Sequence, residues 1–457
     1  MSGVNRTIVS IEPYGDETDA QLVMRLEQTP FAIKRTRINS PVDMTGLPSQ
    51  DDGDGWILQC GQALLERLRN NKEVKNALSA ALVQPANEAS HPICFQISSP
   101  LAGGHAWEAL HTGSSFAALD PRWPIARVVA DAEGANDYVL EQPLRVLAIL
   151  SAAGCPACGE WDGLLEAMRS AKVLGMPVEA RVFVGESELL DTITALDDPA
   201  IHVAGIPHAF EELRRHIEEF RPQILHLYGH GGIASGLRRL EFASISDWDA
   251  NQADGSVRYA LEELAEAAAT SGVWLVVLNA CRTGATTPDS YAFASDLVAR
   301  GIPAAVGMRN AVECDDAHIF CRAFYDDLLR RLSKVVASAA DKRHVGFEWA
   351  DILGAARRTL RDTHGADPAT SHEWTLPVLY TRRDVFRVLV STPELPADAA
   401  RELIGQAHTL AAFEALAKQS LPPGLLEAAR DQTEQAFAKL ATSTDPSQDG
   451  SPGTAGA

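Results

Sequence analysis

Residues Ile224–Gly232 read ILHLYGHGG, and residues Val273–Gly284 read VWLVVLNACRTG. Each stretch begins as an apolar run of the length and composition expected of a buried strand. The first run ends in His230, which is enclosed by glycines, and the second ends in Cys281. Ligands of open α/β sheets bind beyond the carboxyl ends of the strands. The two stretches therefore predict a histidine and a cysteine at the same edge of an α/β sheet.

Around these stretches, apolar strands alternate with helical segments. Such alternation is typical of βαβ units, which require a parallel sheet. We therefore predict an α/β fold in which a mostly parallel sheet is flanked by helices on both faces. The predicted strands are Ile93–Ile97, Leu144–Leu150, Val178–Val184, Ile224–Tyr228, Val273–Leu278 and Ala304–Met308, with Trp374–Tyr380 as a last strand or edge segment. The predicted helices are Glu160–Leu174, Ala209–Phe220, Arg258–Thr270, Asp289–Arg300, Ala317–Leu332 and Phe347–Thr363.

The two ends of the chain show weaker patterns. Near the N-terminus we predict a strand pair, Thr7–Glu12 with Ala32–Ile38, and a helical stretch, Trp56–Leu82. After a compositional break at residues 391–396, amphipathic Ala-rich segments predict a helical C-terminal appendage, which could recruit a partner or pack on the sheet. The final Ser, Thr, Pro and Gly residues lack periodicity and predict disorder. The expected divisions are 1–95, the main region 96–390, the appendage 391–441 and the tail 442–457.

The composition excludes several classes of protein. The 61 acidic residues outnumber the 40 Lys and Arg residues, which gives a net charge of −21. This charge repels phosphate backbones, so direct nucleic-acid binding is not expected. The same charge could favour basic polypeptides, although acidity more often only keeps a protein soluble. Neither a membrane span nor a signal peptide is visible, so we expect a cytoplasmic protein.

The seven cysteines are an odd number in a long chain, which favours reduced thiols over a disulfide framework. Cys155 and Cys158 have the CxxC spacing of redox and metal sites. A zinc site needs a second ligand pair, and no CxxC or HxxxH elsewhere supplies one, so no metal is predicted. The segment Cys314–His318 also contains ligand types, but its acidic residues fit a helix start.

The histidine and the cysteine can act together. Side chains at the ends of neighbouring parallel strands, about 4.8 Å apart, come within reach of one another. An imidazole can take the proton of a thiol and later protonate a leaving amine. His230 lies about 50 residues before Cys281, as in the caspase arrangement. His226, two residues earlier on the strand, could support His230, but core packing is the preferred interpretation.

On these motifs the chain resembles the CHAT family of caspase-like cysteine peptidases, in the caspase and separase clan. Relatives carry Gly-His-Gly after one strand and an Asn-Ala-Cys-Arg-like turn after the next, here Gly229–Gly231 and Asn279–Arg282. His105–Leu110 resembles the family's Pro-Trp-Glu-Leu-Leu segment, with alanine in place of the proline. Further similarity lies in Gly301–Met308, Phe320–Leu328 and Trp374–Tyr380. The resemblance covers roughly residues 90–390.

The resemblance implies roles for the residues near the dyad. His230 is the expected general base and Cys281 the nucleophile, while the backbone N–H groups of Gly231 and Cys281 form the expected oxyanion hole. Asn279 is expected to line the pocket for the substrate residue before the cut. Arg282 either orients the substrate there or is a solvated charge.

The resulting hypothesis is an endopeptidase that cleaves a specific partner protein without a cofactor. The resemblance implies a regulated switch in bacterial defence against phage or in cell death, with an activating partner protein. One alternative is a catalytically silent caspase-like module that binds a peptide at the sheet edge. Another is a redox protein that uses Cys155 and Cys158.

Overall fold

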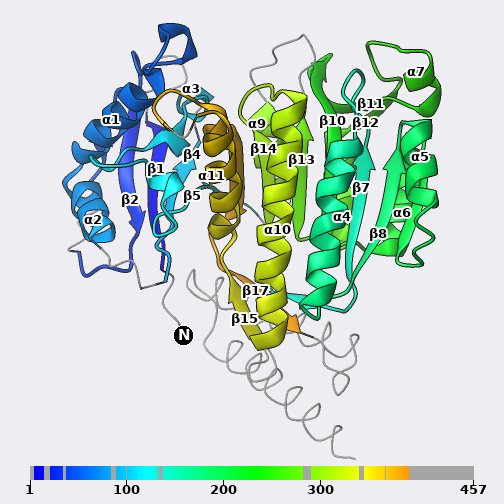
Figure 1. The fold of residues 1–457 in the computed structure, drawn as a ribbon. Helices are drawn as coiled ribbons and strands as arrows, with labels where there is room; N and C mark the ends of the chain where they lie inside the picture. Colours follow the sequence, from blue (N-terminus) through cyan, green and yellow to red (C-terminus); the bar gives the residue numbers. More distant parts are fainter. Residues whose placement is uncertain are drawn as a thin grey trace, which may run out of the picture.

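The computed structural model describes residues 5–390, except 15–20, 34–37, 84–88, 99, 131, 133–136, 281–289, 339–343 and 366. One large sheet runs through this part of the chain, and helices cover both of its faces (Figure 1). A small second sheet joins β15 (His344–Phe347), β17 (Phe386–Val390) and β6 (Asp137–Leu140). The large sheet positions every residue discussed below.

The strands of the large sheet follow the order β3-β2-β1-β4-β5-β16-β14-β13-β10-β7-β8-β9. All neighbours from β14 to β9 are parallel, and so are those from β1 to β16. The antiparallel pair β16 (Pro377–Arg382) and β14 (Ala304–Met308) joins these two halves, which therefore run in opposite directions. We call them the β1–β16 half and the β14–β9 half.

The strands of the large sheet have the following bounds: β1 Thr7–Tyr14, β2 Gln21–Gln28, β3 Ser40–Pro41, β4 Ile93–Ile97, β5 Ile125–Val129, β7 Leu144–Leu150, β8 Val178–Val184, β9 Ile201–Gly205, β10 Ile224–Ala234 and β13 Leu275–Ala280. Two antiparallel strands extend from the end of β10, namely β11 (Leu237–Phe242) and β12 (Val257–Ala260).

The helices are α1 Trp56–Arg69, α2 Lys72–Leu82, α3 Pro100–Gly103, α4 Cys158–Val173, α5 Ser187–Thr194, α6 Phe210–Phe220, α7 Ile245–Asp249, α8 Leu261–Thr270, α9 Ser290–Ala299, α10 Cys314–Ser338 and α11 Leu353–Thr363. Short 3₁₀ turns occur at Gln50–Asp52, Trp107–Ala109, Ala117–Leu119, Trp349–Ile352 and Glu373–Thr375. In Figure 1, α11, α10 and α4 stand side by side in front of the sheet.

The core is divided between the two faces of the sheet. Strand β7 illustrates the division, because Val146 and Ala148 face the core under α4 and α10, whereas Leu147 and Ile149 face the core under α6, α8 and α9. A strand buried on both faces needs apolar residues at successive positions, which explains its uninterrupted apolar sequence. The predicted fold class, a mostly parallel sheet flanked by helices on both faces, is confirmed.

Several predicted elements match the structure closely. Strands β4, β7, β8 and β14 have the predicted bounds, and the helical stretch Trp56–Leu82 is present as α1 and α2. The two helices meet at Asn71, whose side-chain oxygen accepts hydrogen bonds from two N–H groups at the start of α2. Asn is a favoured N-cap residue, and it accounts for the break.

Other predictions were wrong. The strand that pairs with β1 is Gln21–Gln28, and the described residues Ala32, Ile33 and Ile38 lie outside any strand. The first residues of the predicted helix Arg258–Thr270 belong to β12, because they pair with β11. The predicted last strand or edge segment, Trp374–Tyr380, is a strand from Pro377 on, but this strand, β16, lies between two others well inside the sheet and is not an edge.

The predicted appendage, 391–441, and the predicted disordered tail, 442–457, lie outside the described residues, and the division at residue 95 stays a prediction. Among the described helices, none combines the length and the apolar character needed to cross a bilayer.

Candidate active site

His230 lies near the carboxyl end of β10 and its side chain is 2% exposed. Its Nε2 atom is 3.0 Å from the carbonyl oxygen of Ala153, in the loop after β7. A carbonyl can only accept, so Nε2 carries the proton and Nδ1 is the basic nitrogen of the neutral ring. The carbonyl of Ala153 thus fixes both the orientation and the tautomer of the imidazole.

Close packing excludes a Cβ at Gly229 and leaves little room for one at Gly231, the glycines on either side of His230. A Cβ at Gly229 would lie 2.5 Å from the ring of Phe242, and one at Gly231 would lie 3.2 Å from the ring of Phe293. Gly232, in contrast, faces open space. The rings of Phe242 and Phe293 therefore account for the glycines of the Gly-His-Gly sequence.

Strand β13 lies directly beside β10, with Gly229 paired to Ala280 in parallel register. His230 and Cys281 are the next residues along the two strands. The predicted adjacency of the strands is therefore confirmed, but Cys281 and Arg282 lie outside the described residues. Gly231 pairs with Leu240 of β11. The dyad, the oxyanion hole and the role of Arg282 stay predictions.

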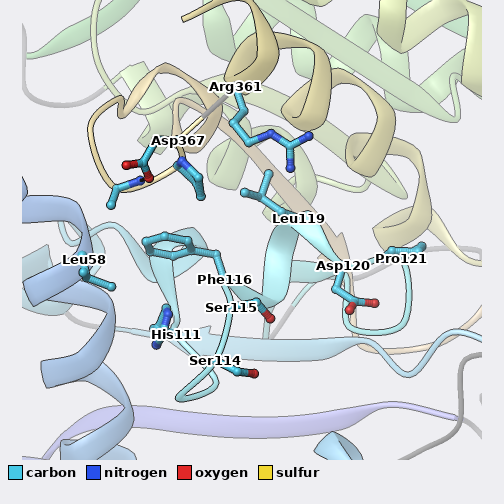
Figure 2. Close-up of a pocket in the computed structure, with 12 residues that line it drawn as sticks. Leu58, His111, Ser114, Ser115, Phe116, Leu119, Asp120, Pro121, Arg361 and Asp367 are labelled. Atoms are coloured by element: carbon cyan, nitrogen blue, oxygen red, sulfur yellow. Dashed lines mark hydrogen bonds between the residues drawn. The ribbon is translucent and has the colours of Figure 1, made fainter. Parts of the chain in front are cut away.

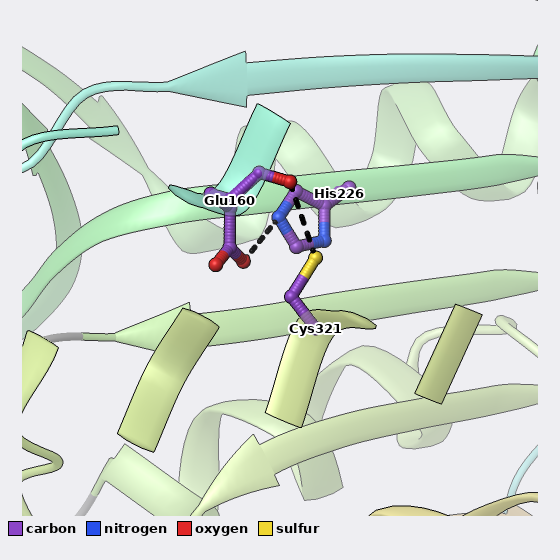
Figure 3. Close-up of side chains that lie close together, drawn as sticks. All are labelled: Glu160, His226 and Cys321. Carbon is purple, nitrogen blue, oxygen red and sulfur yellow. Dashed lines mark hydrogen bonds and ion pairs between the residues drawn. The ribbon is translucent and has the colours of Figure 1, made fainter. Parts of the chain in front are cut away.

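Below His230, a group of polar side chains is fully buried between β10, β13, α4 and α10. Glu160 of α4, His226 of β10 and Cys321 of α10 offer ligand atoms that all lie within 4.8 Å of one another (Figure 3). Nε2 of His226 is 2.8 Å from Oε1 of Glu160. The thiol of Cys321 donates to the backbone carbonyl of Glu160 over 3.5 Å. We call these three residues and Asn279 the Glu160 cluster.

Two observations argue against a metal ion in the Glu160 cluster. First, burial and the nearby charge of Glu160 raise the pKa of the Cys321 thiol well above its usual value, so that the sulfur remains protonated. Second, the Glu160 carboxylate already accepts a hydrogen bond of 2.6 Å from the amide of Asn279. A metal ion here would have to displace both the proton and the amide. His226 thus has a role beyond simple core packing, since it contacts a buried carboxylate.

Asn279 is fully buried, and its amide nitrogen donates to Glu160 and, over 2.9 Å, to the carbonyl of Ala317. Both of its amide protons are thus used inside the protein. Its predicted place in the substrate pocket stays a prediction, and the structure gives it an additional role as a donor to Glu160.

The prediction that the cysteines are all reduced thiols was wrong for two of them. Cys155 and Cys314 form a disulfide, with Cα atoms 6.0 Å apart. Among the described residues, Cys60, Cys94, Cys158 and Cys321 are free. The pairing could not be expected from the sequence, because the two cysteines are 159 residues apart and meet only when α10 packs on α4.

Two cavities lie away from His230. One, of about 410 Å³, is lined by residues of the β1–β16 half and α11, including His111, Phe116 and Arg361 (Figure 2). Another, of about 1010 Å³, lies between α4, α10 and α11 and is lined by Gly159 and His318 among others. Neither lining contains a residue of β10 or β13.

Sequence reasoning missed Glu160 and Ala153. Glu160 occupies a position of α4 that otherwise belongs to the apolar stripe of Trp161, Leu164 and Ala167. A lone carboxylate on an apolar stripe needs a buried partner, and this pattern could have identified it. Ala153 contributes only a backbone carbonyl, for which the sequence contains no signal.

Comparison with protein families gives one match. Residues 168–376 match the family model described as CHAT domain. The match spans 209 of the 457 residues, which is less than half of the chain. The matched segment contains the Gly-His-Gly and Asn-Ala-Cys-Arg motifs, and it confirms the family resemblance that these motifs indicated.

Among solved structures, the chain is similar to two crystal structures of the Saccharomyces cerevisiae separase–securin complex, at 2.6 and 3.0 Å resolution. Both show 12% identity and a TM-score of 0.33, and they cover 70% and 65% of this chain. The chain spans only 17% and 15% of those chains. A likeness this remote supports no inference about the present chain. No curated protein matches it.

Proposed function

We propose that the CHAT domain is a cysteine endopeptidase that uses His230 as general base and Cys281 as nucleophile. The observation that carries the proposal is the anchoring of His230. Its Nε2–H is held by the Ala153 carbonyl, which makes Nδ1 the basic nitrogen, and β10 lies beside the strand that leads to Cys281. A base whose second nitrogen is held by an orienting group is the arrangement required for nucleophilic catalysis.

The chemistry follows from this arrangement. Nδ1 of His230 takes the thiol proton of Cys281, and the thiolate attacks the scissile carbonyl carbon. The backbone N–H groups of Gly231 and Cys281 stabilise the resulting oxyanion, each donor contributing about 10²–10³ in rate. The protonated His230 then gives its proton to the leaving amine, which departs as the C–N bond breaks. Water, deprotonated by the same imidazole, attacks the thioester and releases the carboxylic acid and the free thiol.

The proposed substrate is a specific partner protein, and the proposed role is a regulated switch in defence or cell death, triggered by an activating partner. A test is mapping of new protein N-termini in cells that contain the wild-type chain or Cys281→Ala. We expect cleavage of one or a few proteins with the wild type and none with the variant. Cleavage that persists in Cys281→Ala would contradict the mechanism.

The catalytically silent peptide-binding module is the competing function, and a thiol-reactive peptidyl probe separates the two. We expect selective labelling of Cys281 that is lost in His230→Ala. Cys60→Ala serves as the matched control, because burial raises the pKa of that thiol to about 11 and keeps it unreactive. Equal labelling of the wild type and His230→Ala would favour the silent module.

A further inference from the structure

The loop after β7 carries the carbonyl that orients His230, and a disulfide joins this loop to α10. Strands β14, β13, β10 and β7 are neighbours in this order and run parallel, so their carboxyl ends lie at one edge of the sheet. Cys155 lies in the loop after β7, and Cys314 begins α10 after β14. The Cys155–Cys314 disulfide therefore joins the segments that follow the two outer strands, and the strands of the proposed dyad lie between these outer strands.

Cys155 closes a tight turn that has Ala153 and Gly154 at its centre. The N–H of Cys155 donates to the carbonyl of Ala152 over 2.9 Å, and Gly154 has a φ of +77°. Glycine readily adopts this left-handed φ at the third position of a β-turn. The carbonyl of Ala153 lies 3.0 Å from Nε2 of His230. The disulfide thus holds the last residue of the turn, two residues after the carbonyl that fixes the imidazole.

Hydrogen bonds fix both ends of this loop. Before the turn, the N–H of Ser151 donates to the carbonyl of Tyr228 over 2.9 Å, and the Ser151 hydroxyl donates to the carbonyl of Ala243 over 2.6 Å. After the turn, the N–H of Ala157 donates to the carboxylate of Glu186 over 2.6 Å. The disulfide adds a covalent bond to α10 between these two anchors.

A weaker link between the loop and α10 runs beside the disulfide. The hydroxyl of Tyr228 donates to the carbonyl of Pro156 over 3.4 Å, and it lies 3.2 Å from Nε2 of His318 in α10. This link remains when the disulfide is broken. Loss of the disulfide therefore loosens the turn without releasing the whole loop.

We propose that the Cys155–Cys314 disulfide positions His230 and acts as a redox switch. The inference rests on the proposed peptidase, because it concerns the base of that mechanism. With the disulfide formed, the carbonyl of Ala153 holds the tautomer and the orientation of the imidazole. With the disulfide reduced, the turn moves more freely, and the imidazole is held less well for proton transfer from Cys281. A small misplacement of a catalytic group lowers the rate strongly, so the oxidised chain is the faster form.

The switch requires a dithiol reductant, which dithiothreitol represents in the tests below. Cys155 is 3% exposed and Cys314 is only partly buried, so the reductant attacks the sulfur of Cys314. The S–S bond breaks, Cys155 leaves as a thiolate and takes a proton, and a mixed disulfide forms at Cys314. The second thiol of the reductant then displaces Cys314 as a thiol and closes the disulfide of the reductant. Two electrons and two protons pass to the protein.

The alternative of a redox pair formed by Cys155 and Cys158 does not match this bonding. Cys155 is bonded to Cys314, whereas Cys158 is free and exposed at the start of α4. Cys158→Ser therefore serves as a matched control. It removes an accessible thiol from the same segment and leaves the disulfide in place.

The first measurement is peptide mapping by mass spectrometry, without reduction, on the full chain purified in the absence of reductant. We expect Cys155 and Cys314 in one cross-linked pair of peptides, which dithiothreitol separates. A free Cys155 in this protein, or a bond between Cys155 and Cys158, would overturn the proposal.

The second measurement is the rate at which the thiol-reactive peptidyl probe labels Cys281. The oxidised wild type is compared with the same protein after reduction and removal of the dithiothreitol. We expect labelling to slow about tenfold on reduction. The apparent pKa of labelling should also move toward the ordinary thiol value of about 8.5, a change that a loss of stability alone would not produce.

The double variant Cys155→Ser/Cys314→Ser separates the disulfide from other thiols, including Cys281. We expect this variant to label slowly and not to slow further with dithiothreitol, whereas Cys158→Ser should behave as the wild type. Circular dichroism checks that each variant is folded. No slowing of the wild type on reduction, or an equal slowing of the double variant, would overturn the proposal.

A glycine variant tests the turn without changing a sulfur. Gly154→Ala places a side chain at a φ of +77°, which strains the turn although the space around it is open. Gly175→Ala is the matched control, because Gly175 has a φ of +83° and equally open surroundings beyond the far end of α4. We expect only Gly154→Ala to slow the labelling of Cys281. Equal labelling rates in the two variants would contradict a positioning role of the turn.

Nitrogen-15 NMR of the histidine rings separates this proposal from the peptidase mechanism. If Cys281 is labelled in no form of the protein, the proposed peptidase is wrong, and the imidazole of His230 still reports on the disulfide. We expect the Nε2–H tautomer in the oxidised wild type and a mixture of tautomers in Cys155→Ser/Cys314→Ser, with the signals assigned by their loss in His230→Gln. The same tautomer and the same imidazole pKa in both proteins would overturn the proposal.

Discussion

Two carboxylates are completely buried, one in each half of the sheet, and their surroundings differ. Glu108, next to the β1–β16 half, accepts two hydrogen bonds from the guanidinium of Arg127, at 3.0 and 2.9 Å. Glu160, on the β14–β9 half, contacts His226 and the amide of Asn279. In the described part of the chain, Oε2 of Glu160, both ring nitrogens of His226 and Oδ1 of Asn279 have no hydrogen-bond partner.

The different surroundings of the two carboxylates indicate a structural role for Glu108 and a functional role for Glu160. Burial alone would raise the pKa of Glu108, but the charge and hydrogen bonds of Arg127 outweigh it and lower this pKa. The pair is complete and serves to hold the fold together. Buried polar atoms without hydrogen-bond partners destabilise a fold, so the Glu160 cluster lowers the stability of the protein. The cluster lies next to the strand ends that carry the proposed dyad, and proteins tolerate a local loss of stability at functional sites.

The largest expected effect is that of breaking the complete pair. Arg127→Met leaves the charge of Glu108 buried without its partner, and it also removes donors to the carbonyls of Gly103 and His105. We expect the free energy of unfolding, measured in urea, to fall by about 3–5 kcal/mol. Arg122→Met is the control: its ion pair with Asp120 is 32% exposed on the arginine side, and it should cost less than about 1 kcal/mol. Equal losses of unfolding free energy in the two variants would show that the buried ion pair stabilises the fold no more than the exposed one.

Next comes Glu160→Gln, which neutralises the carboxylate and nearly preserves its shape. We expect labelling of Cys281 by the peptidyl probe to slow about 10–100-fold, with a loss of only about 1–2 kcal/mol in stability, since the carboxylate that contacts both β10 and β13 loses its charge. The pH profile of labelling should also shift, which a purely structural defect would not produce. An unchanged labelling rate would make Glu160 a structural residue like Glu108.

Asn279→Ala sharpens the comparison further. Removal of the Asn279 amide deprives Glu160 of a hydrogen-bond donor, and we expect a loss of about 1–3 kcal/mol in unfolding free energy. Cleavage of a peptide library by the same variant tests the pocket prediction. A changed preference for the residue before the cut would place Asn279 in the pocket, whereas an unchanged preference would restrict it to the Glu160 cluster.

The smallest expected effect concerns His91, in the β1–β16 half. Burial lowers the pKa of this imidazole to about 4, and its Nε2 is 2.9 Å from the hydroxyl of Thr7. The unfolded chain protonates at its ordinary pKa near 6.5, above the folded value. The stabilising contribution is therefore complete above about pH 6.5 and is lost as the pH falls toward 4.

Between pH 7 and pH 5, we expect the unfolding free energy of the wild type to fall by about 1 kcal/mol more than that of His91→Gln. Urea unfolding of both proteins at the two pH values measures this difference. Parallel losses in the two proteins would show that another group is responsible.

The sequence allowed prediction of those features that depend on local patterns. Buried strands such as β7 are readable because both of their faces need apolar residues, and the glycines around His230 are visible as a motif. The disulfide partner of Cys155, the carbonyl of Ala153 and the position of β16 could not be predicted, because each depends on which distant segments pack together. Glu160 falls between these cases, since its place on an apolar stripe was visible while its partner was not.

The position of β16 has a consequence for synthesis of the protein. This strand is translated after β14 and about 250 residues after β5, yet it hydrogen-bonds to both, with Tyr380 opposite Arg127 and Pro377 opposite Met308. The other strands of both halves of the sheet are therefore synthesised before β16, which joins the halves. Until residues 377–382 leave the ribosome, β5 and β14 each present an unpaired edge. A nascent chain that already carries His230 and Cys281 thus remains without its complete sheet until residues 377–382 have emerged.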